Sequence, residues 1–287
     1  MKKIVNVFQR STITTTSGAK IATYVASPTN IARPVGYVGI LHGYSDHITY
    51  YSDFAHALTQ NGFCVFGYDR RGKGNTPGDQ AYIINRAIDT QDFNEIKSYI
   101  CPKEKVHIFG NSLGGCLALH MGIKNSNIIK SIITINPAIE NNDKVIQVNK
   151  YAFRLAKILM KTPIFDLFTF KAMDVHSITK DKEMTSKMEN DPLFYKGPLK
   201  GATAREIHHL MEEVKTNVKA MKVPWLLHLS SKDECVNSNI TRNCFDAMIL
   251  RDKKLHEYNA DHVLYSKEKN YSEQMVYNTL PWLYSHL

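Results

Sequence analysis

One serine in this chain is flanked by glycines, in the stretch HIFGNSLGGCLAL at residues 107–119. Ser112 lies between Gly110 and Gly114, just after one apolar run and just before another. This strand–turn–helix placement is typical of a nucleophile elbow, a sharp turn that exposes the hydroxyl above the end of a strand. Such a turn has no room for side chains two positions before and after the serine. A phosphate-binding loop would need Gly-Lys-Ser/Thr, and a simple helix cap would not need both glycines.

A serine hydroxyl is a poor nucleophile without a base. Where the serine lies on a nucleophile elbow, the acid and the base follow it along the chain in the order Ser, Asp, His. His262 is the best downstream histidine, because the sequence YNADHVLY places it in a turn just past an expected strand. Of the other downstream histidines, His228 and His256 fall within expected strands, and His208 and His209 lie on an expected helix.

The acid that orients the imidazole should leave the end of the preceding strand. The sequence WLLHLSSKDECV places Asp233 there, and Glu234 is the neighbouring alternative. Asp261 adjoins His262 in the chain, so its side chain is poorly placed to bond that imidazole. We therefore predict a triad of Ser112, Asp233 and His262.

An oxyanion formed at this serine needs two preorganised N–H donors. One is expected from the backbone of Leu113, directly after the nucleophile. The other is expected from Tyr44, in the loop LHGYSDHITYY that follows the strand at 35–41. We expect His42 to hydrogen-bond within this loop, and the segment DRRGKGNTPG at 69–78 to buttress the site loops.

Near-continuous apolar runs alternate with helical patterns of 10–15 residues, which indicates buried parallel strands joined by helical crossovers. The predicted class is α/β with a doubly wound, mostly parallel sheet. Its strands are expected at 35–41, 63–69, 105–110, 130–137, 223–230 and 253–258, with antiparallel edge strands near 3–8 and 20–26.

The alternation of strands and helices breaks between residues 138 and 217. Helical patterns and an apolar, aromatic stretch occur there without a strand that would extend the sheet. We predict a core formed by residues 1–137 and 218–287, with an inserted helical cap, or lid, at 138–217.

The composition limits the partners and cofactors. The chain of 287 residues has no long apolar run and no recognisable signal peptide, so we expect a cytoplasmic protein. Five scattered cysteines favour free thiols. The segment HHLMEE lacks metal-ligand spacing, and we interpret it as a helix surface. A serine triad needs neither a metal nor an organic cofactor, and we predict none. The net charge of +9 comes from scattered lysines, which argues against nucleic acid.

A basic amphipathic helix is expected at residues 144–161, followed by the apolar stretch TPIFDLFTF. Its apolar stripe fits either packing on the core or peripheral contact with an anionic membrane, and the sequence leaves both open.

These stretches together resemble the serine hydrolases of the α/β-hydrolase superfamily, and more narrowly the monoacylglycerol lipase and lysophospholipase-like branch. The resemblance rests on LHGYSDHITYY, YDRRGKGNTPG, FGNSLGG, NDPLFYKGPLKGATARE, SSKDECV and ADHVLYSKE. The NDPL segment carries the narrower assignment. The chain departs from that branch at Asn111, where histidine is frequent, and in a divergent, lysine-rich cap.

The resemblance implies an α/β-hydrolase fold and hydrolysis of lipidic carboxylic esters, most of all monoacylglycerols. It implies that Ser112 is the nucleophile, Asp233 the acid and His262 the base, with Tyr44 and Leu113 at the oxyanion hole. A lysophospholipase, a broad carboxylesterase and an acyltransferase remain alternatives. The complete set of triad residues argues against a non-catalytic binding module.

Overall fold

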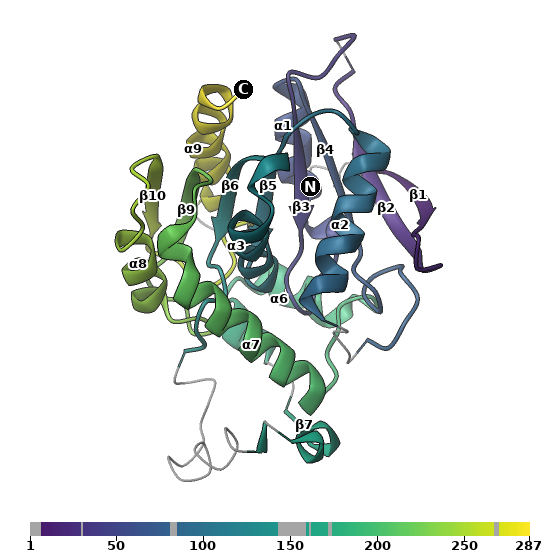
Figure 1. Ribbon diagram of the computed structural model, residues 1–287, viewed down its shortest axis with the longest axis vertical. Helices are drawn as coiled ribbons and strands as arrows, with labels where there is room; N and C mark the ends of the chain where they lie inside the picture. Colours follow the sequence, from purple (N-terminus) through teal and green to yellow (C-terminus); the bar gives the residue numbers. More distant parts are fainter. Residues whose placement is uncertain are drawn as a thin grey trace.

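The computed structural model describes residues 7–29, 31–80, 85–142, 159–160, 162–171, 174–266 and 270–287. Its centre is an eight-stranded sheet in the order β1-β2-β4-β3-β5-β6-β9-β10 (Figure 1). The strands of this sheet are β1 (Gln9–Thr14), β2 (Lys20–Ala26), β3 (Gly36–Leu41), β4 (Phe63–Tyr68), β5 (Val106–Asn111), β6 (Ile129–Ile135), β9 (Trp225–Ser230) and β10 (Lys253–Tyr258).

The six strands from β4 to β10 in this order are parallel neighbours, and β1 and β2 add two antiparallel strands at one edge. All residues of β4, β5 and β9 are buried, as the near-continuous apolar runs predict for strands covered on both faces. The predicted α/β class with a mostly parallel sheet is therefore confirmed.

The edge strand β1 at Gln9–Thr14 was not predicted from the sequence. The strand expected near 3–8 falls mostly on residues 1–6, which lie outside the described part of the chain. The tight turn at 15–19, in which Gly18 has φ of 80°, sets the register so that Thr14 faces Lys20. Because β2 ends at Ala26, pairing from this turn reaches back only to Gln9, which faces Val25.

Helices cover both faces of the sheet. Helices α1 (Ser52–Gln60) and α9 (Tyr271–Ser285) pack together on one face (Figure 1). The other face carries α2 (Arg86–Ile100), α3 (Leu113–Lys124) and α8 (Ser238–Asp246). None of the described helices combines the length and the apolar character that crossing a bilayer requires.

Residues 138–217 make up most of the chain between β6 and β9, and we call them the β6–β9 connection. The connection holds α5 (Val175–Ile178), α6 (Lys182–Asn190) and α7 (Gly201–Asn217). Its short strands β7 (Thr169–Phe170) and β8 (Leu199–Lys200) pair with each other, and in the described part of the connection no strand joins the large sheet. Most of the amphipathic helix expected at 144–161 lies outside the described residues.

Helix α7 is anchored to the core by two acidic side chains. Arg86 of α2 donates to Glu206 at 2.8 Å and to Glu213 at 2.7 Å. Lys124 at the end of α3 lies 2.9 Å from the same Glu213 carboxylate. The interpretation of HHLMEE as a plain helix surface is therefore wrong for Glu213, because α7 packs against α3.

Candidate active site

Ser112 occupies a strained turn between β5 and α3. Its backbone has φ of 52° and ψ of −117°, a left-handed φ that a residue with a Cβ rarely adopts. Such a conformation costs on the order of 1–3 kcal/mol, so the surroundings must hold it. The Ser112 N–H donates to the carbonyl of Ile135 at 2.9 Å, and its carbonyl accepts from Ala138 at 2.9 Å. The turn is thus fixed on both sides by the chain that leaves β6.

The glycines around the serine allow a close backbone approach. A Cβ on Gly114 would collide with the carbonyls of Leu41 and His42 at the end of β3. A Cβ on Gly110 would lie 2.6 Å from the carbonyl carbon of Gly114, closer than real Cβ contacts. The crowding inferred from the sequence is therefore present on both sides of Ser112.

Asp233 and His262 meet above the ends of β9 and β10. His262 Nδ1 lies 2.5 Å from Asp233 Oδ2, and both side chains are buried. The other carboxylate oxygen, Oδ1, accepts the N–H groups of Cys235 at 2.7 Å and Val236 at 2.9 Å. These two bonds fix the carboxylate so that only Oδ2 faces the imidazole.

The contact with Asp233 determines the direction in which the pKa of the His262 imidazole shifts. Burial alone lowers the pKa of His262, but the negative charge of Asp233 and the hydrogen bond to it outweigh burial, with smaller contributions from Asp261 and Asp46. The pKa of His262 is therefore raised. An imidazole that gains proton affinity in this way is suited to take a proton from a nearby hydroxyl.

The two alternative acids contact the β6–β9 connection instead of the imidazole. Asp261 Oδ2 accepts from the Thr179 hydroxyl at 3.0 Å and from the Lys180 N–H at 2.7 Å. Glu234 forms an ion pair with the Lys180 ammonium at 3.1 Å. Of the three acidic residues considered in the sequence, Asp233 is the one that lies against His262.

Asn136 links the serine turn to the histidine loop, and sequence reasoning missed it. Its side-chain Nδ2 donates to the carbonyl of His262 at 3.0 Å and to Ser230 Oγ at 2.8 Å. Its backbone is left-handed, with φ of 41°, and its neighbours Ile135 and Ala138 bond the Ser112 backbone. The Asn-Pro dipeptide directly after an apolar strand could have signalled this turn.

This link brings Ser112, Asp233 and His262 to one end of the sheet. The described residues include no hydrogen bond between the Ser112 hydroxyl and His262. Catalytic hydrogen bonds are often long without substrate and tighten when it binds.

The loop after β3 presents Tyr44, whose backbone N–H has no acceptor among the described residues, like that of Leu113 at the start of α3. His42 shapes this loop. Its Nδ1 lies 2.9 Å from the carbonyl of Gly43, and its Nε2 accepts the N–H of Arg70 at 3.0 Å. Burial and the nearby charge of Arg70 lower the pKa of His42, which suits a neutral, structural role.

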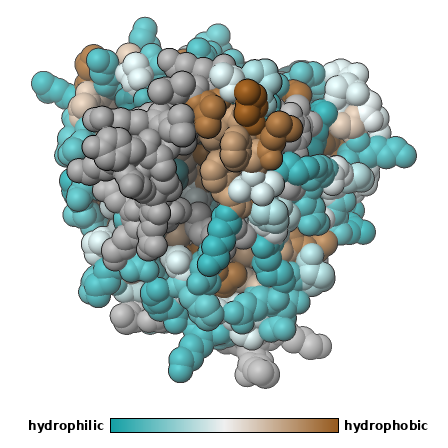
Figure 2. All heavy atoms as spheres, turned by 90° about the horizontal axis from the view of Figure 1, so that it is seen from below, coloured by the Kyte–Doolittle hydropathy of each residue, from teal (hydrophilic) through white to brown (hydrophobic). Residues whose placement is uncertain are grey.

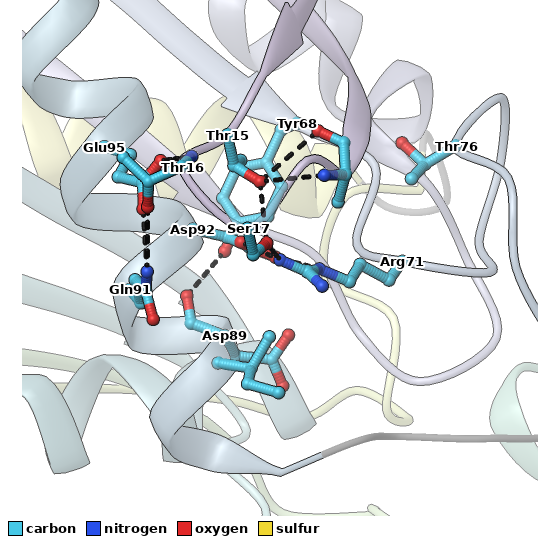
Figure 3. Close-up of polar contacts among 12 residues, drawn as sticks. Thr15, Thr16, Ser17, Tyr68, Arg71, Thr76, Asp89, Gln91, Asp92 and Glu95 are labelled. Carbon is cyan, nitrogen blue, oxygen red and sulfur yellow. Dashed lines mark hydrogen bonds and ion pairs between the residues drawn. The ribbon is translucent and has the colours of Figure 1, made fainter.

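The segment 69–78 contacts this loop, as predicted. The Arg70 guanidinium donates to the carbonyl of Gly43. Arg71 holds the segment to α2 through a bidentate pair with Asp92, at 2.8 and 2.7 Å, and to Ser17 at 2.7 Å (Figure 3). Arg70 thus holds the loop after β3, and Arg71 holds the segment to α2 and to the β1–β2 turn.

Comparison with known proteins identifies the family. A family model described as serine aminopeptidase, S33, matches residues 32–266. The chain belongs to this family. This chain, an S33 hydrolase, is 24% identical over 259 residues to a protein of Mycolicibacterium smegmatis named monoacylglycerol lipase. The match covers 88% of this chain and 90% of that protein.

Two solved structures show the same fold. A soluble variant of monoglyceride lipase from Saccharomyces cerevisiae, in complex with a substrate analogue, matches with a TM-score of 0.85 at 19% identity, over 100% of this chain and 98% of that one. A carboxyl esterase from Bacillus coagulans matches with a TM-score of 0.81 at 14% identity, over 98% and 99% of the two chains. The S33 hydrolase therefore has the α/β-hydrolase fold, as the sequence resemblance implies.

Among the described residues of the S33 hydrolase, one group of possible metal ligands comes together. Asp233, Cys235 and His262 offer ligand atoms that all lie within 4.8 Å of one another. A metal would need the Cys235 thiolate, but burial and the charge of Asp233 raise the pKa of this thiol. Its Sγ donates to the carbonyl of Ser177 at 3.3 Å. The donor set fits a hydrogen-bonded acid–imidazole pair and does not fit a metal centre.

Proposed function

We propose that this S33 hydrolase is a serine esterase that cleaves lipidic carboxylic esters, monoacylglycerols above all. The observation that carries the proposal is the buried Asp233–His262 pair, with one carboxylate oxygen locked by backbone N–H groups and the other on the imidazole. It lies at the same end of the sheet as the strained turn of Ser112. The combination of a strained serine, an oriented imidazole and two N–H donors is suited to acyl transfer.

The proposed reaction follows from these positions. His262 Nε2 takes the proton of the Ser112 hydroxyl as Oγ attacks the ester carbonyl, and Asp233 stabilises the imidazolium. The N–H groups of Tyr44 and Leu113 hold the tetrahedral oxyanion. The imidazolium then gives its proton to the leaving alcohol. Water, activated by the same imidazole, hydrolyses the acyl-enzyme.

The β6–β9 connection is proposed to act as the lid over this site. It touches the site loops at several points, such as the Tyr195 N–H, which donates to the carbonyl of Ser45 at 2.8 Å. Asp191 in the NDPL segment lies 2.9 Å from His47 Nε2. These contacts support a lid that shapes the entrance, so the connection is where acyl and alcohol specificity would be set.

Relatives and neighbours support two substrate classes. The protein from M. smegmatis and the yeast structure are named as monoacylglycerol or monoglyceride lipases, and the B. coagulans protein as a carboxyl esterase. We expect higher kcat/KM on long-chain monoacylglycerols than on short aryl esters, with lysophospholipids cleaved more slowly. Preference for short soluble esters would favour a broad carboxylesterase. Formation of a new ester with excess alcohol would favour an acyltransferase.

A fluorophosphonate probe tests the reaction class itself. The wild-type protein is expected to be labelled, with the modified peptide containing Ser112, because only an activated serine reacts readily with the probe. Heat-unfolded protein is the control, since it keeps every serine and loses the triad. A folded wild-type protein that stays unlabelled would remove the basis for the hydrolase proposal.

We also propose that the lid docks on anionic membranes. The described lid residues leave apolar side chains exposed at Ile164, Leu167, Phe168 and Phe170. Figure 2 shows a cluster of apolar side chains on the face seen from below. The net charge of the chain is +9, which would draw such a patch toward an anionic surface.

Vesicle sedimentation tests this docking. The protein should bind vesicles that contain anionic lipid more strongly than neutral ones. The change Leu167→Ser should weaken binding about 10-fold, because this side chain is 84% exposed and free to enter the lipid. Ile249→Ser is the matched control, since Ile249 is 79% exposed on the loop before β10. Equal binding to both vesicle types, or equal loss with both variants, would contradict docking through the lid.

A further inference from the structure

A buried lysine lies beside the proposed oxyanion loop, and the mechanism above does not use it. Lys73, in the segment 69–78, is only 2% exposed. Its Nζ lies 4.1 Å from the ring centroid of Tyr44 and 4.2 Å from that of Tyr195. It also donates to the carbonyl of Gln80. Lysine is almost never fully buried unless it is paired, and no carboxylate lies within ion-pair distance of Lys73 among the described residues.

The two rings around this ammonium belong to different parts of the molecule. Tyr44 follows β3 and carries one of the proposed oxyanion N–H groups, whereas Tyr195 belongs to the lid. The rings contact each other edge to face, with centroids 5.9 Å apart and planes at 82°. A cation held between two such faces is attracted to both, most strongly where water is excluded. The ammonium therefore draws the oxyanion loop and the lid toward the same point.

The segment 69–78, which carries Lys73, is held in place by its own contacts. Arg71 ties its segment to α2 and to the β1–β2 turn (Figure 3), and Gly72 and Gly74 adopt left-handed φ of 72° and 49° on either side of it. Asp69 Oδ2 accepts the Asn75 N–H at 2.8 Å. Since these contacts involve neither Tyr44 nor Tyr195, Lys73 can set the position of Tyr44.

We propose that the Lys73 ammonium is a positioning group for the oxyanion hole: it clamps Tyr44 against Tyr195, which fixes the Tyr44 N–H and holds the lid in place over it. The inference rests on the proposed hydrolase function. Among the described residues, Lys73 makes no polar contact with the triad, so it acts through Tyr44 and Tyr195.

The charge of this clamp is sensitive to pH. Burial, and then the nearby charge of Arg70, lower the pKa of Lys73 to about 7, against the opposing carboxylates of Asp46, Asp79 and Asp89. Among the described residues, these charged groups, together with Tyr44, Tyr195 and the Gln80 carbonyl, face the ammonium from the neighbouring elements. A neutral amine loses the attraction to both rings. Activity should therefore decline as pH rises through the pKa of Lys73.

The test compares variants of the full chain on a short soluble ester, so that lipid binding does not enter. Lys73→Met keeps most of the side-chain volume and is expected to lower kcat roughly 10- to 100-fold with little change in KM. This range is below the loss seen when an oxyanion donor is removed outright. Lys73→Arg should recover part of kcat and move the alkaline decline to higher pH, because guanidinium stays charged and stacks on aromatic rings.

Tyr195→Leu provides a second test of the clamp, because it leaves Lys73 in place. It removes one face of the clamp and should lower kcat in the same way, with Tyr195→Phe retaining more of it. Lys253→Met is the matched control, since Lys253 also lies over a ring, that of Phe245 at 5.0 Å, near α8. It should leave kcat unchanged.

The outcomes separate this inference from the proposed function. Fluorophosphonate labelling of the wild type tests the function and is measured first. If the wild type is labelled but Lys73→Met and Tyr195→Leu keep its kcat and its pH profile, the positioning role is overturned. If the wild type is not labelled, the hydrolase proposal fails and the inference fails with it.

Discussion

Ser112→Ala is expected to reduce ester hydrolysis by about 10³- to 10⁶-fold in kcat and to abolish fluorophosphonate labelling. The loss follows because the proposed acyl-enzyme cannot form without the hydroxyl, while the oxyanion donors and the binding surface remain. Alanine keeps the Cβ that the turn already accommodates at φ of 52°. The protein should therefore remain folded, with a Tm close to that of the wild type.

Kinetics on the ester panel, labelling and thermal unfolding together check this prediction. Ser98→Ala is the matched control, because Ser98 is an exposed serine on α2. A Ser112→Ala protein that is folded and still turns over esters at the wild-type rate would place the nucleophile elsewhere.

Asp233→Asn is expected to lower kcat about 10⁴-fold without unfolding the protein. Asparagine keeps an oxygen that can accept from the N–H groups of Cys235 and Val236, so its amide NH₂ replaces the oxygen that faced His262. Nδ1 of the imidazole must then accept a hydrogen bond, which puts the proton on Nε2. In that tautomer Nε2 cannot take the proton of the Ser112 hydroxyl.

The same substitution should move the pH profile. In the wild type, Asp233 raises the pKa of His262 above 6.5, so the neutral base appears, and kcat/KM rises, only as pH passes through this raised pKa. Removing the carboxylate charge lowers the pKa of the imidazole, so the acid limb of kcat/KM should shift to lower pH. Pre-steady-state acylation measured across pH would show both the loss of rate and the shift.

Glu234→Gln is the control for the acid. Glu234 pairs with Lys180 of the lid and not with the imidazole. This variant should keep kcat within about 3-fold, as expected for an exposed ion pair that contributes little. A large loss with Glu234→Gln and a small one with Asp233→Asn would reverse the assignment.

The parts of the site that could be predicted from sequence are those for which neighbouring residues in the chain indicate the local structure. The glycines on both sides of Ser112 mark the elbow because the backbone contacts that exclude side chains lie within one strand–turn–helix unit. Asp233 and His262 could be chosen because each follows a buried parallel strand, and parallel strands end at the same edge of a sheet.

The features that sequence reasoning missed depend on contacts between distant segments. Asn136 works by bridging to Ser230 and to His262, which lie 94 and 126 residues further along the chain. The clamp around Lys73 needs three segments to meet, and a lysine in a glycine-rich turn reads as solvent-exposed. The strand β1 was missed because it is mostly exposed and carries little apolar pattern, so the turn sets its register.

The contacts of the β6–β9 connection limit which segments this protein could exchange with its relatives in a chimaera. Ser45, Arg86 and Asp261 of the core each bond a residue of the connection, at Tyr195, Glu206 and Lys180. A chimaera that imports the connection from another S33 hydrolase would leave these core groups without their partners, one of them next to the proposed base. Grafts designed to change substrate preference therefore need to carry the three pairs as units, together with the segment itself.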